Sequence, residues 1–152
     1  MKVIAVCVFF GHRNTPENIK GRLAKEIKRL ISKEKVTEFL VGNNGQFDAM
    51  AKMALRKMKE CYPYINYSVV LAYIPGEKKI EDWMDYSESL YPDCLDGVPP
   101  KFAIAKRNEW MVTKADYVIA YVRWTVGGAA KYVLLAERRG KKVINLASFE
   151  DM

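Results

Sequence analysis

The chain of 152 residues is 50% hydrophobic and 28% charged, a balance typical of one globular domain that excludes a disordered tail or a collagen-like fibre. Its 25 Lys and Arg residues outnumber its 18 Asp and Glu residues, so the formal charge is +7. A basic balance favours an anionic partner, whether a phosphate, a nucleotide, nucleic acid or an acidic lipid.

Cysteine and histidine usage narrows the chemistry. Cys7, Cys61 and Cys94 are far apart and form no CxxC pair, and His12 is the single histidine. This pattern argues against a disulfide framework, a thiolate zinc site and a histidine-rich site, so we expect no metal. No signal peptide opens the chain, and no apolar run is long enough to span a bilayer. We therefore expect a cytoplasmic protein with no membrane partner.

The first apolar run, residues 3–10, has no charged interruption, which is typical of a central parallel strand covered on both faces. Thr15 is expected to cap the helix that follows, with Pro16 at its first position and Glu17 in its first turn. Apolar residues then recur at helical spacing and predict one buried helix face: Ile19, Leu23, Ile27, Leu30 and Ile31.

A second strand is predicted over residues 36–41, and the glycines and asparagines of residues 42–45 end it. The next helix has one apolar face, formed by Phe47, Met50, Ala54, Met58 and Cys61. The third strand is predicted over residues 67–73, where Pro75 and Gly76 stop it.

Residues 76–101 interrupt this alternation and are expected to form an insertion after the third strand. Long loops of this kind are often functional, and we expect a short helix near residues 80–90. Its aromatic residues Trp83, Tyr86 and Tyr91 either stack on a ligand ring or anchor the insertion to the core.

The regular pattern resumes with a helix over residues 102–114, a strand over 117–122, a helix over 129–138 and a strand over 142–146. Strands that alternate with helices predict the α/β class, with a parallel sheet between two helical layers. We expect one domain over residues 1–152, a Rossmann-like three-layer sandwich with a five-stranded, mainly parallel sheet of order 3-2-1-4-5.

In such a sheet, ligands bind beyond the carboxyl ends of the strands, at the switch point between strands 1 and 4. Polar and glycine residues gather in the loops at this edge. After the first strand, Gly11 would let a ligand approach the backbone, Arg13 would hold a phosphate, and His12 would donate to one. The alternative is a loop histidine beside a solvated arginine.

The loop after the second strand places backbone N–H groups at a helix start, where an anion is favoured. Asn43 and Asn44 would read a ribose or a base edge. Asp48 has two interpretations: it complements the helix dipole, with Asn44 as cap, or it faces the ligand and suits ribose hydroxyls better than phosphate. Asp48 is also the one candidate for a catalytic residue.

Two further segments complete the predicted site. Gly127 and Gly128 open a helix and either cradle a phosphate or permit tight helix–sheet packing. Arg107 and Asn108 interrupt an apolar helix face, which favours a role at the site over a surface position. The candidate ligand-binding residues are Gly11, His12, Arg13, Gly42, Asn43, Asn44, Gly45, Asp48, Arg107, Asn108, Thr125, Gly127 and Gly128.

Four segments taken in order resemble the SLOG superfamily: Phe10-Gly11-His12-Arg13, the loop of residues 41–48, Arg107-Asn108 with Met111, and Gly127-Gly128-Ala129-Ala130. The resemblance covers nearly the whole chain and is closest to small bacterial and phage members near the YpsA-like group. It implies a Rossmann-like fold and a pocket for a nucleotide or nucleotide sugar, with no required cofactor.

Members of the superfamily include the LOG phosphoribohydrolases, the DNA-processing protein DprA, and sensors of nucleotide signals related to NAD or ADP-ribose, some in bacterial or phage defence. Relatives often associate through helices, so the resemblance implies a homodimer or higher homo-oligomer. Met50, Met53, Met58 and Trp110 are the candidates for its apolar surface.

The chain departs from the LOG pattern Pro-Gly-Gly-x-Gly-Thr-x-x-Glu. Aligned on Gly127 and Gly128, it has Val126 for the proline and Leu134 for the glutamate, which is catalytic in that family. The resemblance therefore favours binding, by sensing or sequestering a nucleotide-derived ligand, over catalysis. The alternatives are an N-glycosidic hydrolase or transferase acting on nucleotides and, further, DprA-like binding of single-stranded DNA.

Overall fold

The computed structural model describes residues 4–73, 89–123 and 127–147. Helices and strands alternate along most of the chain, as predicted. In chain order the elements are β1 (Val6–Gly11), η1 (Glu17–Ile19), α1 (Lys20–Ser32), β2 (Glu38–Val41), α2 (Gln46–Cys61), β3 (Asn66–Val70), β4 (Ser89–Leu90), η3 (Asp93–Leu95), α3 (Pro100–Lys114), β5 (Tyr117–Tyr121), α4 (Gly128–Arg138) and β6 (Lys142–Asn145).

The sheet has six strands in the order β4-β3-β2-β1-β5-β6, and every neighbouring pair is parallel. The predicted order of the five longer strands is confirmed, but the predicted strand number is wrong. The sixth strand, β4, has two residues, Ser89 and Leu90, which pair with Val69 and Val70. A strand this short has no alternating pattern in the sequence, because its pairing with β3 alone defines it.

The helix predicted near residues 80–90 lies mostly outside the described residues, and its last two positions are strand β4. Trp83 and Tyr86 also lie outside the described part of the chain. Tyr91 is half-buried and packs against the hydrophobic core, which favours the anchoring interpretation for that residue.

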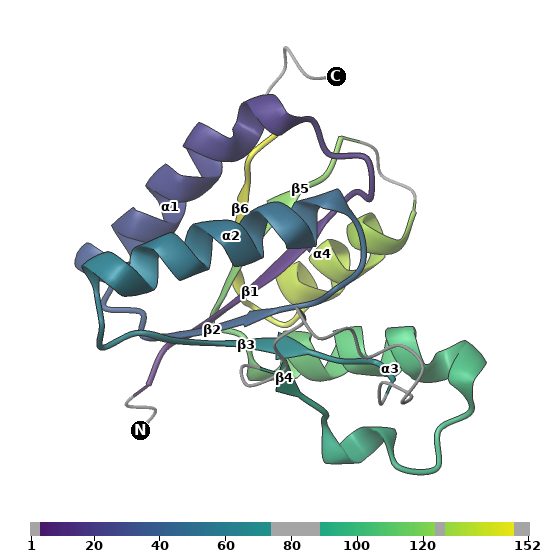
Figure 1. Cartoon of the computed structure of the whole chain (residues 1–152). Coiled ribbons are helices and arrows are strands. Elements are labelled where there is room, and N and C mark those ends of the chain that lie inside the picture. Colours follow the sequence, from purple (N-terminus) through teal and green to yellow (C-terminus); the bar gives the residue numbers. More distant parts are fainter. Residues whose placement is uncertain (1–3, 74–88, 124–126, 148–152) are drawn as a thin grey trace, which may run out of the picture.

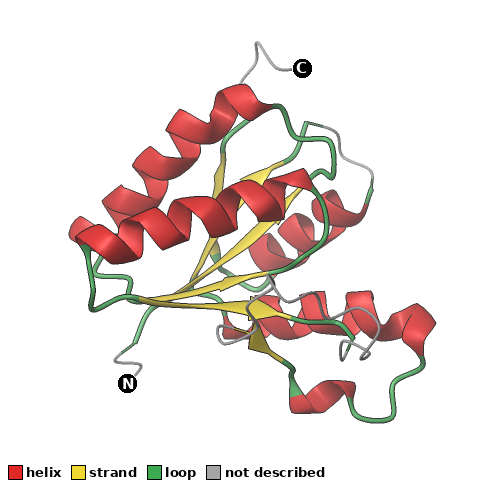
Figure 2. Ribbon diagram, in the orientation of Figure 1, coloured by secondary structure: helices red, strands yellow, loops and turns green. Residues whose placement is uncertain are grey.

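Helices cover both faces of the sheet, with α1 and α2 on one side and α3 and α4 on the other (Figures 1 and 2). Strand β1 contributes side chains to the cores on both faces of the sheet, because successive side chains of a strand point to opposite faces. Cys7 and Phe9 join the core under α1 and α2, whereas Val8 and Phe10 join the core under α3 and α4. The uninterrupted apolar run of the sequence follows from this double burial.

Thr15 does not cap a helix. Its hydroxyl donates to the carbonyl of His12 over 2.6 Å, and the side chain is fully buried. Pro16 precedes the short helix η1, and α1 continues from it. Thr15 therefore stabilises the turn after β1 instead, a use of the hydroxyl that competes with capping.

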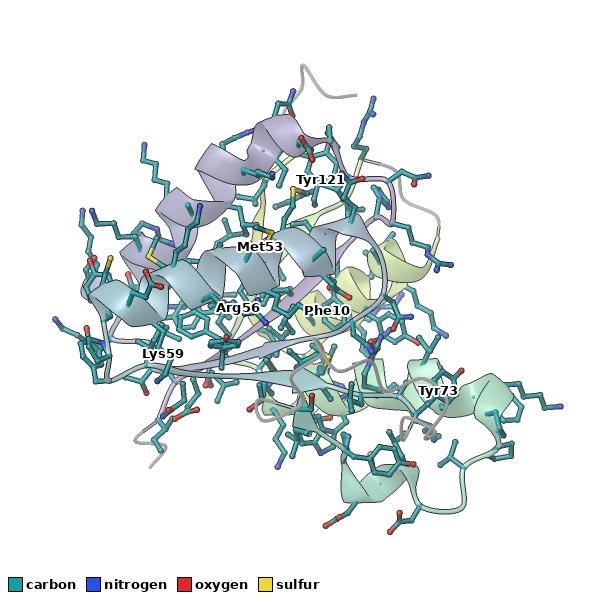
Figure 3. All side chains as sticks on the ribbon, in the orientation of Figure 1. Phe10, Met53, Arg56, Lys59, Tyr73 and Tyr121 are labelled. Carbon is teal, nitrogen blue, oxygen red and sulfur yellow. The ribbon has the colours of Figure 1, made fainter. Side chains whose placement is uncertain are left out.

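The described part of the chain contains no helix long and apolar enough to cross a membrane. Among the residues expected to form an apolar surface, Met50 is buried, and Met58 and Trp110 pack against the two cores. Met53 is 55% exposed on the outer side of α2 (Figure 3). The homo-oligomer stays a prediction.

Candidate functional site

A cavity of about 330 Å³ opens where the carboxyl ends of β1 and β2 meet the first turn of α4. Helix α3 supplies the opposite wall. This is the edge of the sheet at which the chain crosses from one helical layer to the other. The lining residues are Phe9, Phe10, Gly11, His12, Arg13, Gly42, Asn44, Asp48, Ile104, Arg107, Asn108, Met111, Gly128, Ala129 and Tyr132.

Arg107 projects from α3 and is 3% exposed. Its Nη1 donates to Oδ1 of Asn43 (3.1 Å) and of Asn44 (2.9 Å), and to the carbonyl of Val70 (3.4 Å). Its Nε donates to Oδ1 of Asn108 over 3.1 Å. The guanidinium therefore joins α3 to the loop after β2 and to the end of β3.

Asp48 lies in the first turn of α2 and is 8% exposed. Its Oδ2 accepts the backbone N–H of Asn44 over 3.0 Å. Burial raises the pKa of Asp48 to about 6, although the N–H of Asn44 and the charges of Arg107 and Lys52 oppose the rise. Asn44 is not the predicted side-chain cap of α2. Its side-chain oxygen accepts from Arg107, and its backbone N–H donates to Asp48.

Gly42 separates the two buried charges. A Cβ at this position would lie 2.8 Å from Oδ2 of Asp48 and 3.3 Å from Cζ of Arg107. Burial lowers the pKa of Arg107, and the charge of Asp48 acts in the opposite direction. Glycine at position 42 therefore lets the Asp48 carboxylate and the Arg107 guanidinium both approach the backbone of that residue.

Arg13 lines the cavity from the loop after β1, beside the start of α2, and is exposed. Its carbonyl accepts the N–H of Gln46 over 2.9 Å, which ties the loop after β1 to the start of α2. Gly45 makes this contact possible: its φ is +95°, and a Cβ there would lie 2.9 Å from Cα of Arg13. Gly45 supports the site without lining the cavity.

His12 ties the end of β1 to the end of β5. The backbone N–H of His12 donates to the carbonyl of Tyr121 (3.2 Å), and its ring Nε2 accepts the backbone N–H of Arg123 (2.9 Å). Burial and the charge of Arg123 both lower the pKa of His12. The predicted donation from this ring to a phosphate is therefore not available through Nε2, because that nitrogen acts as an acceptor.

Gly11 has a packing role that the sequence did not reveal. A Cβ there would overlap the ring of Phe47, so the glycine leaves room for that buried side chain at the start of α2. Gly127, whose φ is +106°, is the N-cap residue of α4, and Gly128 is the first residue of the helix and lines the cavity. Nothing lies within 4 Å of a Cβ built at Gly128.

Nine predicted residues line the cavity: Gly11, His12, Arg13, Gly42, Asn44, Asp48, Arg107, Asn108 and Gly128. Asn43, Gly45 and Gly127 lie in the same loops but do not line it, and Thr125 lies outside the described residues. Their contact with a ligand stays a prediction. Among the residues that the structure describes, no three His, Cys, Asp or Glu side chains form a group that could hold a metal ion.

The sequence analysis did not predict the apolar part of the cavity lining. Tyr132 of α4 is 5% exposed, and its ring stacks on Phe10 with centroids 5.6 Å apart. Figure 3 shows Phe10 beside this helix. Burial, with the charge of Glu109, raises the pKa of Tyr132. Its position four residues after Gly128, one helical turn along the same face, was the available signal.

Comparison with known proteins places the fold. The architecture is similar to that of DNA processing protein A (DprA) from Streptococcus pneumoniae. The two structures share 19% sequence identity with a TM-score of 0.65, over 92% of this chain and 49% of that one. The chain thus spans about half the length of that neighbour. No protein-family model and no curated protein matches the sequence.

The likeness supports the predicted Rossmann-like fold. Membership of the SLOG superfamily and the closer relationship to its YpsA-like members stay predictions. Leu134, which stands where the LOG pattern has its glutamate, is 44% exposed on α4 and does not line the cavity. At that position the chain offers neither a carboxylate nor a side chain in the cavity.

Proposed function

We propose that the chain binds a nucleotide-derived anion in the cavity at the carboxyl edge of its sheet. One observation carries the proposal: a cavity of about 330 Å³ combines an arginine, a glycine-led helix start, a buried polar pair and an apolar wall. Its volume falls near the lower end of the range of about 300–1,000 Å³ for small-molecule sites, which favours a ligand of about mononucleotide size.

The anionic end of the ligand belongs beside Arg13 and the start of α4. Within the described residues, the Arg13 guanidinium makes no hydrogen bond or ion pair, so it is available for bidentate contact with a phosphate. Gly128 also lines the cavity, at the N-terminus of α4, where free N–H groups favour an anion. Asp48 disfavours a phosphate beside its own carboxylate by charge repulsion.

The test is a panel of AMP, ADP-ribose, NAD and cyclic nucleotides, followed by melting temperature and by mass spectrometry of the supernatant. A ligand at 100 times its dissociation constant stabilises the fold by about 2.7 kcal/mol. Arg13→Gln should weaken binding by about tenfold or more, because a charge-assisted hydrogen bond is lost. Arg56→Gln, at an exposed arginine of α2 that does not line the cavity, is the matched control (Figure 3).

The same panel separates binding from turnover. Recovery of the ligand intact supports a sensor or a sequestering protein. Release of free base or ribose phosphate supports the N-glycosidic hydrolase, in which Asp48 is the candidate acid or nucleophile. Stabilisation by no member of the panel would contradict the proposal.

Single-stranded DNA is the second candidate ligand, because the structural neighbour is a DNA processing protein and the chain carries a net charge of +7. Both helices of one layer, α1 and α2, carry exposed cations: Lys20, Lys25, Lys28, Arg56 and Lys57. Fluorescence anisotropy with a labelled oligonucleotide should then show affinity that falls steeply as salt rises. Absence of binding at low salt would remove this candidate.

A further inference from the structure

The carboxylate of Asp48 is only partly used by the protein. The side chain is more than nine-tenths buried and lines the cavity, and its Oδ2 accepts one hydrogen bond, from the N–H of Asn44. Its Oδ1 accepts none from the residues that the structure describes. Because the carboxylate lines the cavity, a ligand there can supply the donor that Oδ1 lacks among the described residues.

Arg107 likewise uses only part of its hydrogen-bonding capacity within the protein. Its Nη1 and Nε hold Asn43, Asn44, Val70 and Asn108, while Nη2 makes no hydrogen bond within residues 4–73, 89–123 and 127–147. Arg107 lines the same cavity, and Gly42 is in reach of both charged groups. The polar wall therefore offers one acceptor and one donor close together.

The Asp48 acceptor and the Arg107 donor together determine which ligand group can bind beside them. A phosphate oxygen would be attracted by Arg107 but repelled by Asp48, and it has no proton to give at neutral pH. A hydroxyl both donates and accepts, so neighbouring hydroxyls of a sugar can serve Oδ1 of Asp48 and Nη2 of Arg107 together. Acidic side chains hold ribose hydroxyls in the same way in dinucleotide-binding sheets.

An apolar part of the cavity lining is suited to the base. Phe10, Met111 and Tyr132 come from β1, α3 and α4 and form an apolar wall, with Tyr132 near Arg107 and Asn108. With a phosphate beside Arg13 and a base against this wall, the sugar is the part of a nucleotide left to face Asp48.

We infer that Asp48 accepts a hydrogen bond from a ribose hydroxyl, so that the cavity takes ribonucleotides and discriminates against deoxyribonucleotides. The inference rests on the proposed function, because it names the class of nucleotide bound at that same site. It assigns Asp48 to binding, and it gives Arg107 two roles, contact with the sugar through Nη2 and positioning of the loop after β2 through Nη1.

The experiment is a calorimetric titration of the full chain with AMP and ADP-ribose, each beside its 2′-deoxy and 3′-deoxy counterpart, at neutral pH. A hydrogen bond to a buried charge corresponds to about 10- to 100-fold in affinity, so at least one deoxy counterpart should bind weaker by that factor. Asp48→Asn should bring the ribose-to-deoxyribose ratio near one, and the exposed acid Asp96→Asn should leave it unchanged.

The outcomes separate the two proposals. Equal affinity for the ribose form and both deoxy forms overturns the role of Asp48 and leaves nucleotide binding intact. An altered base preference in Asp48→Asn, with the deoxy ratio unchanged, overturns it too, because the carboxylate would then read a base edge. If neither AMP nor ADP-ribose binds, both the ribose inference and the ribonucleotide form of the proposed function fail. The wild-type comparison remains decisive if the variant does not fold.

Discussion

Arg107 and Asn44 are joined across 63 residues of chain by a hydrogen bond of 2.9 Å between Nη1 and Oδ1. The bond connects α3, which covers one face of the sheet, with the loop that leads into α2 on the other face (Figure 1). The two helical layers therefore meet at the candidate site through one guanidinium. The site depends on that contact as much as on the loops themselves.

Arg107→Lys should destabilise the fold although it keeps the charge. A lysine ammonium cannot reproduce the fork that holds Asn44 and Asn108 from two nitrogens, so buried acceptors lose their donor. We expect the free energy of unfolding to fall by about 1.5–3 kcal/mol in a urea titration. Lys106→Met, at the exposed neighbouring position, should change it by about 0.5 kcal/mol or less. Equal stability of Arg107→Lys and wild type would show that the guanidinium contacts with Asn44 and Asn108 do not stabilise the fold.

Gly42→Ala should cost stability by steric overlap alone. Its new Cβ would lie 2.8 Å from Oδ2 of Asp48, which forces the carboxylate or the backbone to move. Overpacking of this kind costs about 1–3 kcal/mol. Gly21→Ala is the matched control, because nothing lies within 4 Å of a Cβ there and the helix favours alanine by about 0.5–1 kcal/mol. Unfolding midpoints that rise in both variants would show that Gly42 has room.

Asp48→Asn should stabilise the protein at neutral pH. Burial raises the pKa of Asp48 from 3.8 to about 6, against the N–H of Asn44 and the charges of Arg107 and Lys52. The folded state therefore binds a proton that the unfolded state has lost between these values, so this group's contribution to stability rises as the pH falls. The shift corresponds to about 3 kcal/mol.

The variant removes this dependence, because an asparagine does not titrate. Urea unfolding across a pH series should show the stability advantage of Asp48→Asn at neutral pH shrinking as the pH falls through about 6 towards about 4. A variant less stable than wild type at every pH would show that the ionised carboxylate supports the fold instead.

Local patterns in the sequence predict most of the helices and strands. The uninterrupted run around Val8 and the helical spacing of Leu23 and Ile27 each follow from burial of one short segment, and the structure has these elements. The edge strand of Ser89 and Leu90 is different, because its state is decided by pairing with β3. The cap predicted at Thr15 is wrong for a local reason, because the carbonyl of His12, three residues before it, accepts its hydroxyl.

The candidate site divides in the same way. Glycines and polar residues after the strands mark the edge of the sheet where the cavity lies, and the topology brings them together. The roles of single residues depend on distant partners. Nothing near Asp48 in the chain indicates that Arg107 lies beyond Gly42, and nothing near Gly11 indicates that Phe47 occupies the space of its missing side chain.

The most direct test of the account is to fill the cavity and measure binding. Gly128→Leu places a side chain in the cavity at a position where nothing lies within 4 Å of the Cβ, and Gly21→Leu places the same side chain on α1, outside the cavity. Both variants should fold, as judged by melting temperature. Calorimetric titration with AMP and ADP-ribose should show binding to wild type and Gly21→Leu and its loss in Gly128→Leu. Undiminished binding by Gly128→Leu would contradict the account, because the nucleotide would then bind outside this cavity.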